Sequence, residues 1–64
     1  MVIEELVTFI GKAGDRQATI FYEKEYIQPY RVEYYSENSN LGFIYFLNKE
    51  RAEEAAIIFA FGED

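Results

Sequence analysis

A strict alternation of side chains from position 30 to position 35 constrains the fold of this chain more than any other feature. Apolar or aromatic residues occupy the even positions and mostly charged residues the odd ones: Tyr30, Val32 and Tyr34 against Arg31, Glu33 and Tyr35. A period of two indicates a β-strand that buries one face. Pro29 comes directly before it, and a strand tolerates proline there because no ladder hydrogen bond is lost. The pattern therefore predicts a strand that begins after Pro29.

Three other segments have the composition of strands: Leu6–Ile10, Gln17–Glu23 and Leu41–Leu47. β-branched and aromatic residues, which favour strands, are frequent in them. The first segment also fits a short N-terminal helix within residues 2–10, because its apolar residues fall at helical spacing as well. Its shortness and the lack of an N-cap residue favour the strand.

The connections between these segments are rich in turn-forming residues. Lys12–Asp15 contains Gly14, which can adopt the positive φ that a tight turn needs. Ser36–Asn40 consists mainly of short polar residues, whose side chains compete for backbone hydrogen bonds and favour a loop. The turn at Lys12–Asp15 predicts a hairpin between the first two strands.

The segment Leu41–Leu47 is apolar on both of its faces. In a strand, Phe43 and Tyr45 would point to one face of the sheet, and Ile44 and Phe46 to the other. A strand without a polar face predicts a central position in the sheet, with both faces covered.

The C-terminal segment has the signals of a helix. Asn48 can accept a hydrogen bond from the first turn, glutamates follow it where the helix dipole favours negative charge, and Gly62 marks the end. Its apolar residues form one narrow stripe: Ala52, Ala55, Ala56 and Phe59. By propensity, residues 56–61 could instead form a strand.

Together these patterns predict one small domain, residues 1–64, of the α+β class. We expect a four-stranded, mainly antiparallel sheet with one C-terminal helix packed on one face, in the order β-β-β-β-α. The patterns do not specify which face the helix covers. A chain of 64 residues buries only about 60% of its unfolded surface, so a closed catalytic cavity would be hard to build.

The apolar surface of this predicted fold exceeds what one helix can cover. A helix covers only one face of a sheet, and Ile57 and Phe61 form a second apolar row on the helix itself. Large exposed apolar patches usually mark contact sites. We therefore expect a protein partner, most simply a second copy of the chain, with an interface drawn from the helix and three strands: Ile57, Phe61, Phe21, Tyr35, Ile44 and Phe46.

A self-contained arrangement is the alternative to a partner. In it, Ile57 and Phe61 wrap around the edge of the sheet, while Tyr26 and Ile27 cover the second face.

Cysteine and histidine are both absent from the sequence. Their absence excludes disulfides, thiol catalysis, zinc fingers and the commonest general base. The glycines match neither phosphate-binding motif, and Asp15, Asn38 and Asn40 are too few to hold calcium. We expect a non-enzymatic protein without a cofactor or a metal ion.

The net charge of −6 bears on the partner. Nucleic-acid binders normally carry a basic stripe, and the six basic residues here are scattered, so direct binding to nucleic acid is disfavoured despite the many tyrosines. An alternative function is an acidic mimic of nucleic acid that inhibits a nucleic-acid-binding protein.

No apolar run approaches the ~20 residues of a membrane span, and no signal peptide is visible, so a cytoplasmic location is the default expectation. The size, acidity and lack of catalytic residues are similar in style to those of small accessory proteins of phages or mobile elements.

Overall fold

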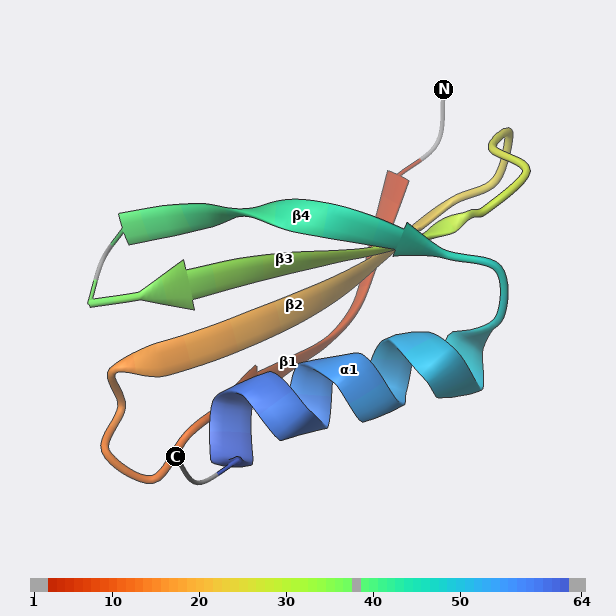
Figure 1. Cartoon of the computed structure of the whole chain (residues 1–64). Coiled ribbons are helices and arrows are strands. Elements are labelled where there is room, and N and C mark those ends of the chain that lie inside the picture. The colour runs from red at the N-terminus through yellow and green to blue at the C-terminus, as the bar shows by residue number, and fades with distance from the viewer. Residues whose placement is uncertain (1–2, 38, 63–64) are drawn as a thin grey trace.

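A computed structural model describes residues 3–37 and 39–62 of the chain. Its elements in chain order are β1 (Ile3–Ile10), β2 (Arg16–Glu23), β3 (Tyr30–Ser36), β4 (Ser39–Phe46) and α1 (Lys49–Phe61). The strands form a four-stranded sheet in the order β1-β2-β3-β4, every neighbouring pair is antiparallel, and α1 lies against one face (Figure 1). The predicted α+β fold is confirmed, and Ile3–Ile10 is a strand rather than the alternative helix. Val2, which belonged to that alternative, lies outside the described residues.

The register of β2 and β3 determines which face the helix covers. Ala18 pairs with Tyr34, and Ile20 pairs with Val32, so these side chains point to the same face. Ala18, Ile20 and Val32 are completely buried under α1. The alternation between positions 30 and 35 therefore has the predicted effect: its even positions face the core.

Small side chains let α1 lie close to the sheet. Ala52, Ala56 and Ala60 are buried along one side of the helix. At the end of β1, a Cβ atom on Gly11 would overlap the carbonyl oxygen of Ala60. Only glycine can occupy that position without moving the end of the helix.

The predicted ends of the helix are confirmed. The Asn48 Oδ1 atom accepts a hydrogen bond from the backbone N–H of Arg51 at 3.0 Å. The Gly62 N–H donates to the carbonyl oxygen of Ile58 at 2.8 Å, although Gly62 has an extended backbone with φ −64° rather than the left-handed one common at helix ends. The alternative strand over residues 56–61 is wrong.

Strand β4 corrects one expectation. Its apolar composition predicted a central position with both faces covered, yet it lies at the edge of the sheet. The cause is connectivity: hairpins place each strand beside the one before it, so the last strand stays outermost. The helix packs chiefly on β2 and β3 and least on β4.

The connections are shorter than expected in one place. Gly14 has the predicted positive φ, 76°. The loop predicted over Ser36–Asn40 is largely strand, because Ser36 pairs with Ser39 across the β3–β4 hairpin and Glu37 adopts a φ of 52°. Asn38 lies outside the described residues.

Among the described residues, the structure contains no helix that is both long enough and apolar enough to cross a membrane.

Candidate functional site

Arg31 is the centre of the sheet face opposite α1, which we call the open face. Its guanidinium carbon lies 4.9 Å from the centre of the Phe21 ring and 5.6 Å from that of Phe43. At these distances a guanidinium interacts favourably with the face of an aromatic ring. Arg31 therefore contacts both rings, and it helps to half-bury Phe21, whereas Phe43 stays 53% exposed.

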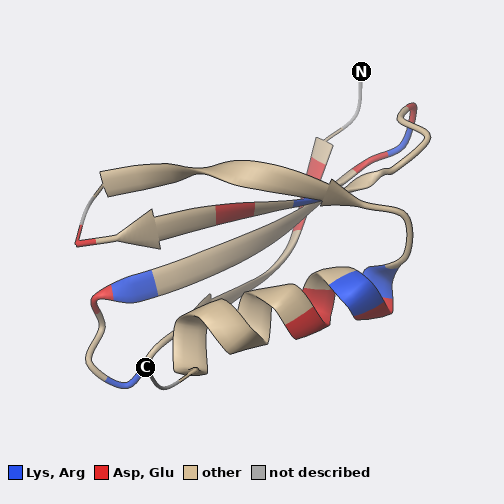
Figure 2. Cartoon of the chain, in the orientation of Figure 1, with Lys and Arg blue, Asp and Glu red and all other residues tan. Residues whose placement is uncertain are grey.

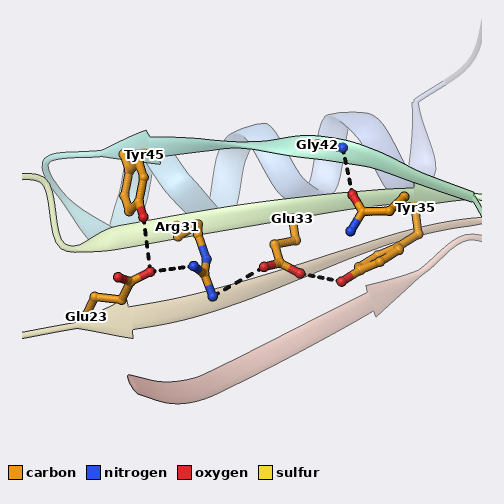
Figure 3. Close-up of polar contacts among 7 residues, drawn as sticks. Glu23, Arg31, Glu33, Tyr35, Gly42 and Tyr45 are labelled. Atoms are coloured by element: carbon orange, nitrogen blue, oxygen red, sulfur yellow. Dashed lines mark hydrogen bonds and ion pairs between the residues drawn. The ribbon is translucent and has the colours of Figure 1, made fainter. Parts of the chain in front are cut away.

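Two carboxylates hold Arg31 in place (Figure 3). Its Nη1 atom lies 2.8 Å from Oε2 of Glu23, and its Nη2 atom lies 3.3 Å from Oε2 of Glu33. Glu23 is only 2% exposed, and a buried carboxylate is tolerated only when it is paired and hydrogen-bonded. The network supplies both conditions, because the Tyr45 hydroxyl also donates to Glu23, at 3.3 Å.

The outer end of this network is a tyrosine. The Tyr35 hydroxyl donates a hydrogen bond to Oε1 of Glu33. This bond to a carboxylate, assisted by partial burial and by the charge of Glu33, raises the pKa of Tyr35 above its ordinary value. Tyr35 therefore stays protonated, as a hydrogen-bond donor, at neutral pH.

The expectation of an apolar second face is thus only partly correct. Phe21 and Tyr35 do lie on the open face, but both are half-buried and are engaged by Arg31 and Glu33 respectively. Nearby, the hydroxyls of Thr8 and Thr19 are hydrogen-bonded to each other at 3.0 Å. Two salt bridges, one hydroxyl pair and a guanidinium over two rings therefore engage part of this face within the single chain.

A shallow concavity of about 450 Å³ lies on the open face beside β1 and β2. Its charged lining groups are acidic: Glu5, Asp15 and Glu37. Among the residues that the structure describes, no group of three metal-ligating side chains is placed to hold an ion. Some of the polar groups here form hydrogen bonds within the sheet. The Thr8 hydroxyl, for example, also donates to Glu5 at 3.3 Å.

Strand β4 carries a group of exposed apolar side chains. Leu41, Phe43 and Ile44 are 57%, 53% and 54% exposed, and Leu47 just beyond the strand is also exposed. No charged residue occurs from Ser39 to Asn48. Isolated exposed apolar residues are ordinary, but an uncharged edge strand that is apolar on both sides is a template for pairing with another chain.

The opposite edge of the sheet, β1, is different. It also exposes Ile3 and Ile10, but Glu4 and Glu5 lie between them. The pairing register shifts between Glu5 and Val7, which is a bulge in the middle of the strand. Charges and bulges are devices by which edge strands avoid pairing, and β1 has both, whereas β4 has no charged residue.

The helix row Ile57 and Phe61 lies on the β1 side of α1. The Phe61 ring meets the Phe9 ring edge-on, with centroids 6.2 Å apart. Both residues of the row remain partly exposed. The self-contained arrangement is therefore correct in part for the helix, since Phe61 reaches the edge strand. It is wrong for Ile27, which is 90% exposed, and correct in part for Tyr26, which stacks on Tyr45.

The six predicted interface residues consequently fall in three places. Phe21 and Tyr35 lie on the open face, Ile57 and Phe61 lie beside β1, and Ile44 and Phe46 lie on the helix side of β4. Phe46 packs against the core, whereas Ile44 is open to solvent. Leu41 and Phe43 were not predicted to be exposed, because a strand that is apolar on both faces was expected in the middle of the sheet. The uncharged run around them was the signal that could have identified an exposed edge.

Comparison of the chain with protein-family models, with curated proteins and with solved structures gave no match. Only its own residues and fold therefore bear on its function.

Proposed function

We propose that the chain is a small, acidic, non-enzymatic protein-interaction module that works as a homodimer. The observation that carries this proposal is β4, an uncharged edge strand whose Leu41, Phe43 and Ile44 are each more than half exposed. A domain of this size has a marginal core, and apolar association adds burial that the single chain does not achieve.

Protein is a better-supported class of partner than nucleic acid. Basic residues occur singly in loops, strands and the first turns of the helix (Figure 2). Arg31 is engaged by Glu23 and Glu33, and Arg16 lies over the Phe59 ring. Counterion release needs several cations along one path, which this distribution does not provide.

The acidic mimic has weaker support. A mimic needs carboxylates that follow a phosphate-like row, and two of them, Glu23 and Glu33, are held inward by Arg31. The remaining described carboxylates are spread over β1, the loops and the helix (Figure 2). An accessory role, as in phages or mobile elements, and a cytoplasmic location complete the proposal.

Sedimentation equilibrium at low and high salt tests this function. Two copies that each carry a charge of −6 repel one another, and salt screens that repulsion. We expect the mass to rise from 7.5 kDa toward twice that value with concentration, and to do so at lower concentration in high salt. A constant 7.5 kDa at every concentration and salt level would contradict the homodimer.

A further inference from the structure

We infer that the dimer, whose existence rests on the function proposed above, forms by antiparallel pairing of β4 with β4 of a second copy, centred on Ile44. The product is a continuous eight-stranded sheet. The inference names one surface and one occupant, a second copy of this chain.

The first step is the unpaired edge. Within the described chain, β4 has a neighbour on one side only, β3, so its other side presents backbone N–H and C=O groups. Such a row is satisfied by another strand as readily as by water. Antiparallel pairing of a strand with its own copy is self-complementary, as a two-fold dimer requires.

The register follows from the irregularity in β4. Tyr34 pairs with Gly42, but Tyr35 pairs with Asn40, so Leu41 is an extra residue that bulges from the strand. The Gly42 N–H donates to the Asn40 side chain at 2.8 Å, which stabilises this bend. The regular stretch is therefore Gly42–Phe46, and its midpoint is Ile44.

Side chains on both faces fit this register. Ile44 meets Ile44 of the second copy on the helix side, where α1 packs least on β4 and Ile44 is 54% exposed. On the open face, Phe43 meets Tyr45 of the second copy. These two rings already contact each other within one chain, with centroids 5.6 Å apart, so the dimer extends an existing aromatic cluster. Aromatic and β-branched cross-strand pairs are favourable in sheets.

Charge explains why this edge is used and why assembly stops at two. A pair of −6 chains associates best where neither brings a charge, and Ser39–Asn48 brings none. The outer edges of the resulting sheet are the two β1 strands, each carrying Glu4 and Glu5. Like charges directly opposite each other destabilise a strand pair, so two dimers do not join through their β1 edges.

The helix row is the rival surface. It has Phe61 already in contact with Phe9, and Glu50 and Glu53 lie on the same side of the helix. Pairing two copies through this row would place the glutamates of each copy at the edge of the interface, whereas pairing through β4 buries an uncharged segment.

Single-cysteine variants test the geometry directly, because the chain has no cysteine of its own. In the proposed register, Ile44→Cys lies opposite itself, at a Cα separation of about 4.5–5.5 Å that a disulfide can bridge. Leu41→Cys, equally exposed on the same strand, would be about 20 Å from its copy, six residues at roughly 3.3 Å each. We expect mild oxidation to cross-link Ile44→Cys and leave Leu41→Cys monomeric under denaturing conditions.

A matched pair of lysine variants gives the equilibrium test. Ile44→Lys places two like charges face to face and removes apolar contact, so we expect its dimer dissociation constant to rise at least about tenfold. Ile27→Lys makes the same substitution at a residue that is 90% exposed in the β2–β3 loop, and we expect no change. Circular dichroism verifies that both variants fold.

The outcomes separate the two proposals. If the parent is a dimer but Ile44→Lys still dimerises, or if Leu41→Cys cross-links as fast as Ile44→Cys, the β4 interface is wrong and the homodimer stands. Dissociation by Phe61→Glu with Ile44→Lys unaffected would likewise move the interface to the helix. A monomeric parent overturns both the interface and the homodimer.

Discussion

At the scale of single residues, Arg31 connects the aromatic and acidic side chains of the open face. It contacts two aromatic rings and two carboxylates, and one of those carboxylates, Glu23, is almost completely buried. Arginine suits this place because its planar guanidinium can stack on rings while its edge donates to carboxylates. Lysine, a compact point charge, cannot perform both roles at once.

The dependence of Glu23 on Arg31 gives the first prediction. Arg31→Met keeps an apolar side chain of similar length but leaves the Glu23 carboxylate buried without a counter-charge. Loss of one partner of a buried pair costs about 3 kcal/mol or somewhat more, so we expect the free energy of unfolding in urea to fall by about that amount.

A matched control is available in the same network. Glu33→Gln removes the other ion pair of Arg31, in which both side chains are partly exposed. We expect a loss of less than about 1 kcal/mol, as for exposed pairs. Equal losses of unfolding free energy in the two variants would show that Arg31 does not stabilise the fold chiefly by pairing with the buried Glu23.

At the scale of elements, the packing of α1 depends on close approach. The buried side of the helix presents alanines, and Gly11 at the end of β1 lies directly against the backbone of Ala60. The helix is stabilised by its close approach to the sheet rather than by large interlocking side chains. A larger side chain at the contact between Gly11 and Ala60 therefore cannot be accommodated without moving the helix.

Gly11→Ala tests this arrangement. The added Cβ overlaps a backbone carbonyl oxygen, which cannot rotate away as a flexible side chain would. The last turn of α1 must therefore shift, at a cost of about 1–3 kcal/mol, measured by urea unfolding. Lys12→Ala, next in sequence and exposed, should change stability by less than about 0.5 kcal/mol. A neutral Gly11→Ala would mean that the helix end is free to move.

Local patterns predicted the elements well. The alternation around Val32, the turn at Gly14 and the cap at Asn48 each express a short-range rule, and each has its expected structure. Such rules act between residues close in sequence and need no knowledge of the final fold.

The position of β4 and the character of the open face could not be predicted in the same way. Composition alone could not place Leu41–Leu47 at an edge, because hairpin connectivity decided it. Nor could a count of apolar residues show that Arg31 lies over the rings of Phe21 and Phe43. That contact depends on the registers of three strands, which become known only once the sheet is assembled.

At the scale of the whole molecule, the two edges of the sheet have opposite character. Both carry apolar residues and both contain a bulge, yet charges lie only on β1, as Glu4 and Glu5. The bulge of β1 is in the middle of the strand and that of β4 is near its start. In the dimer that we propose, this asymmetry leaves one edge available for pairing and protects the other, so that association would close at two copies instead of producing fibres.

Removing the charge from β1 should therefore change the assembly. In Glu4→Gln/Glu5→Gln the second edge loses its repulsion, while the hydrogen bond from Thr8 keeps an acceptor. We expect light scattering to show species larger than two chains at concentrations where the parent shows none, since both edges of each copy can then pair.

Glu50→Gln/Glu54→Gln makes the same change of net charge on exposed helix residues and should behave like the parent. If both double variants form equally large assemblies, the net charge of the chain rather than the protection of β1 limits assembly. If only Glu4→Gln/Glu5→Gln forms larger assemblies, the two glutamates at the β1 edge set that limit.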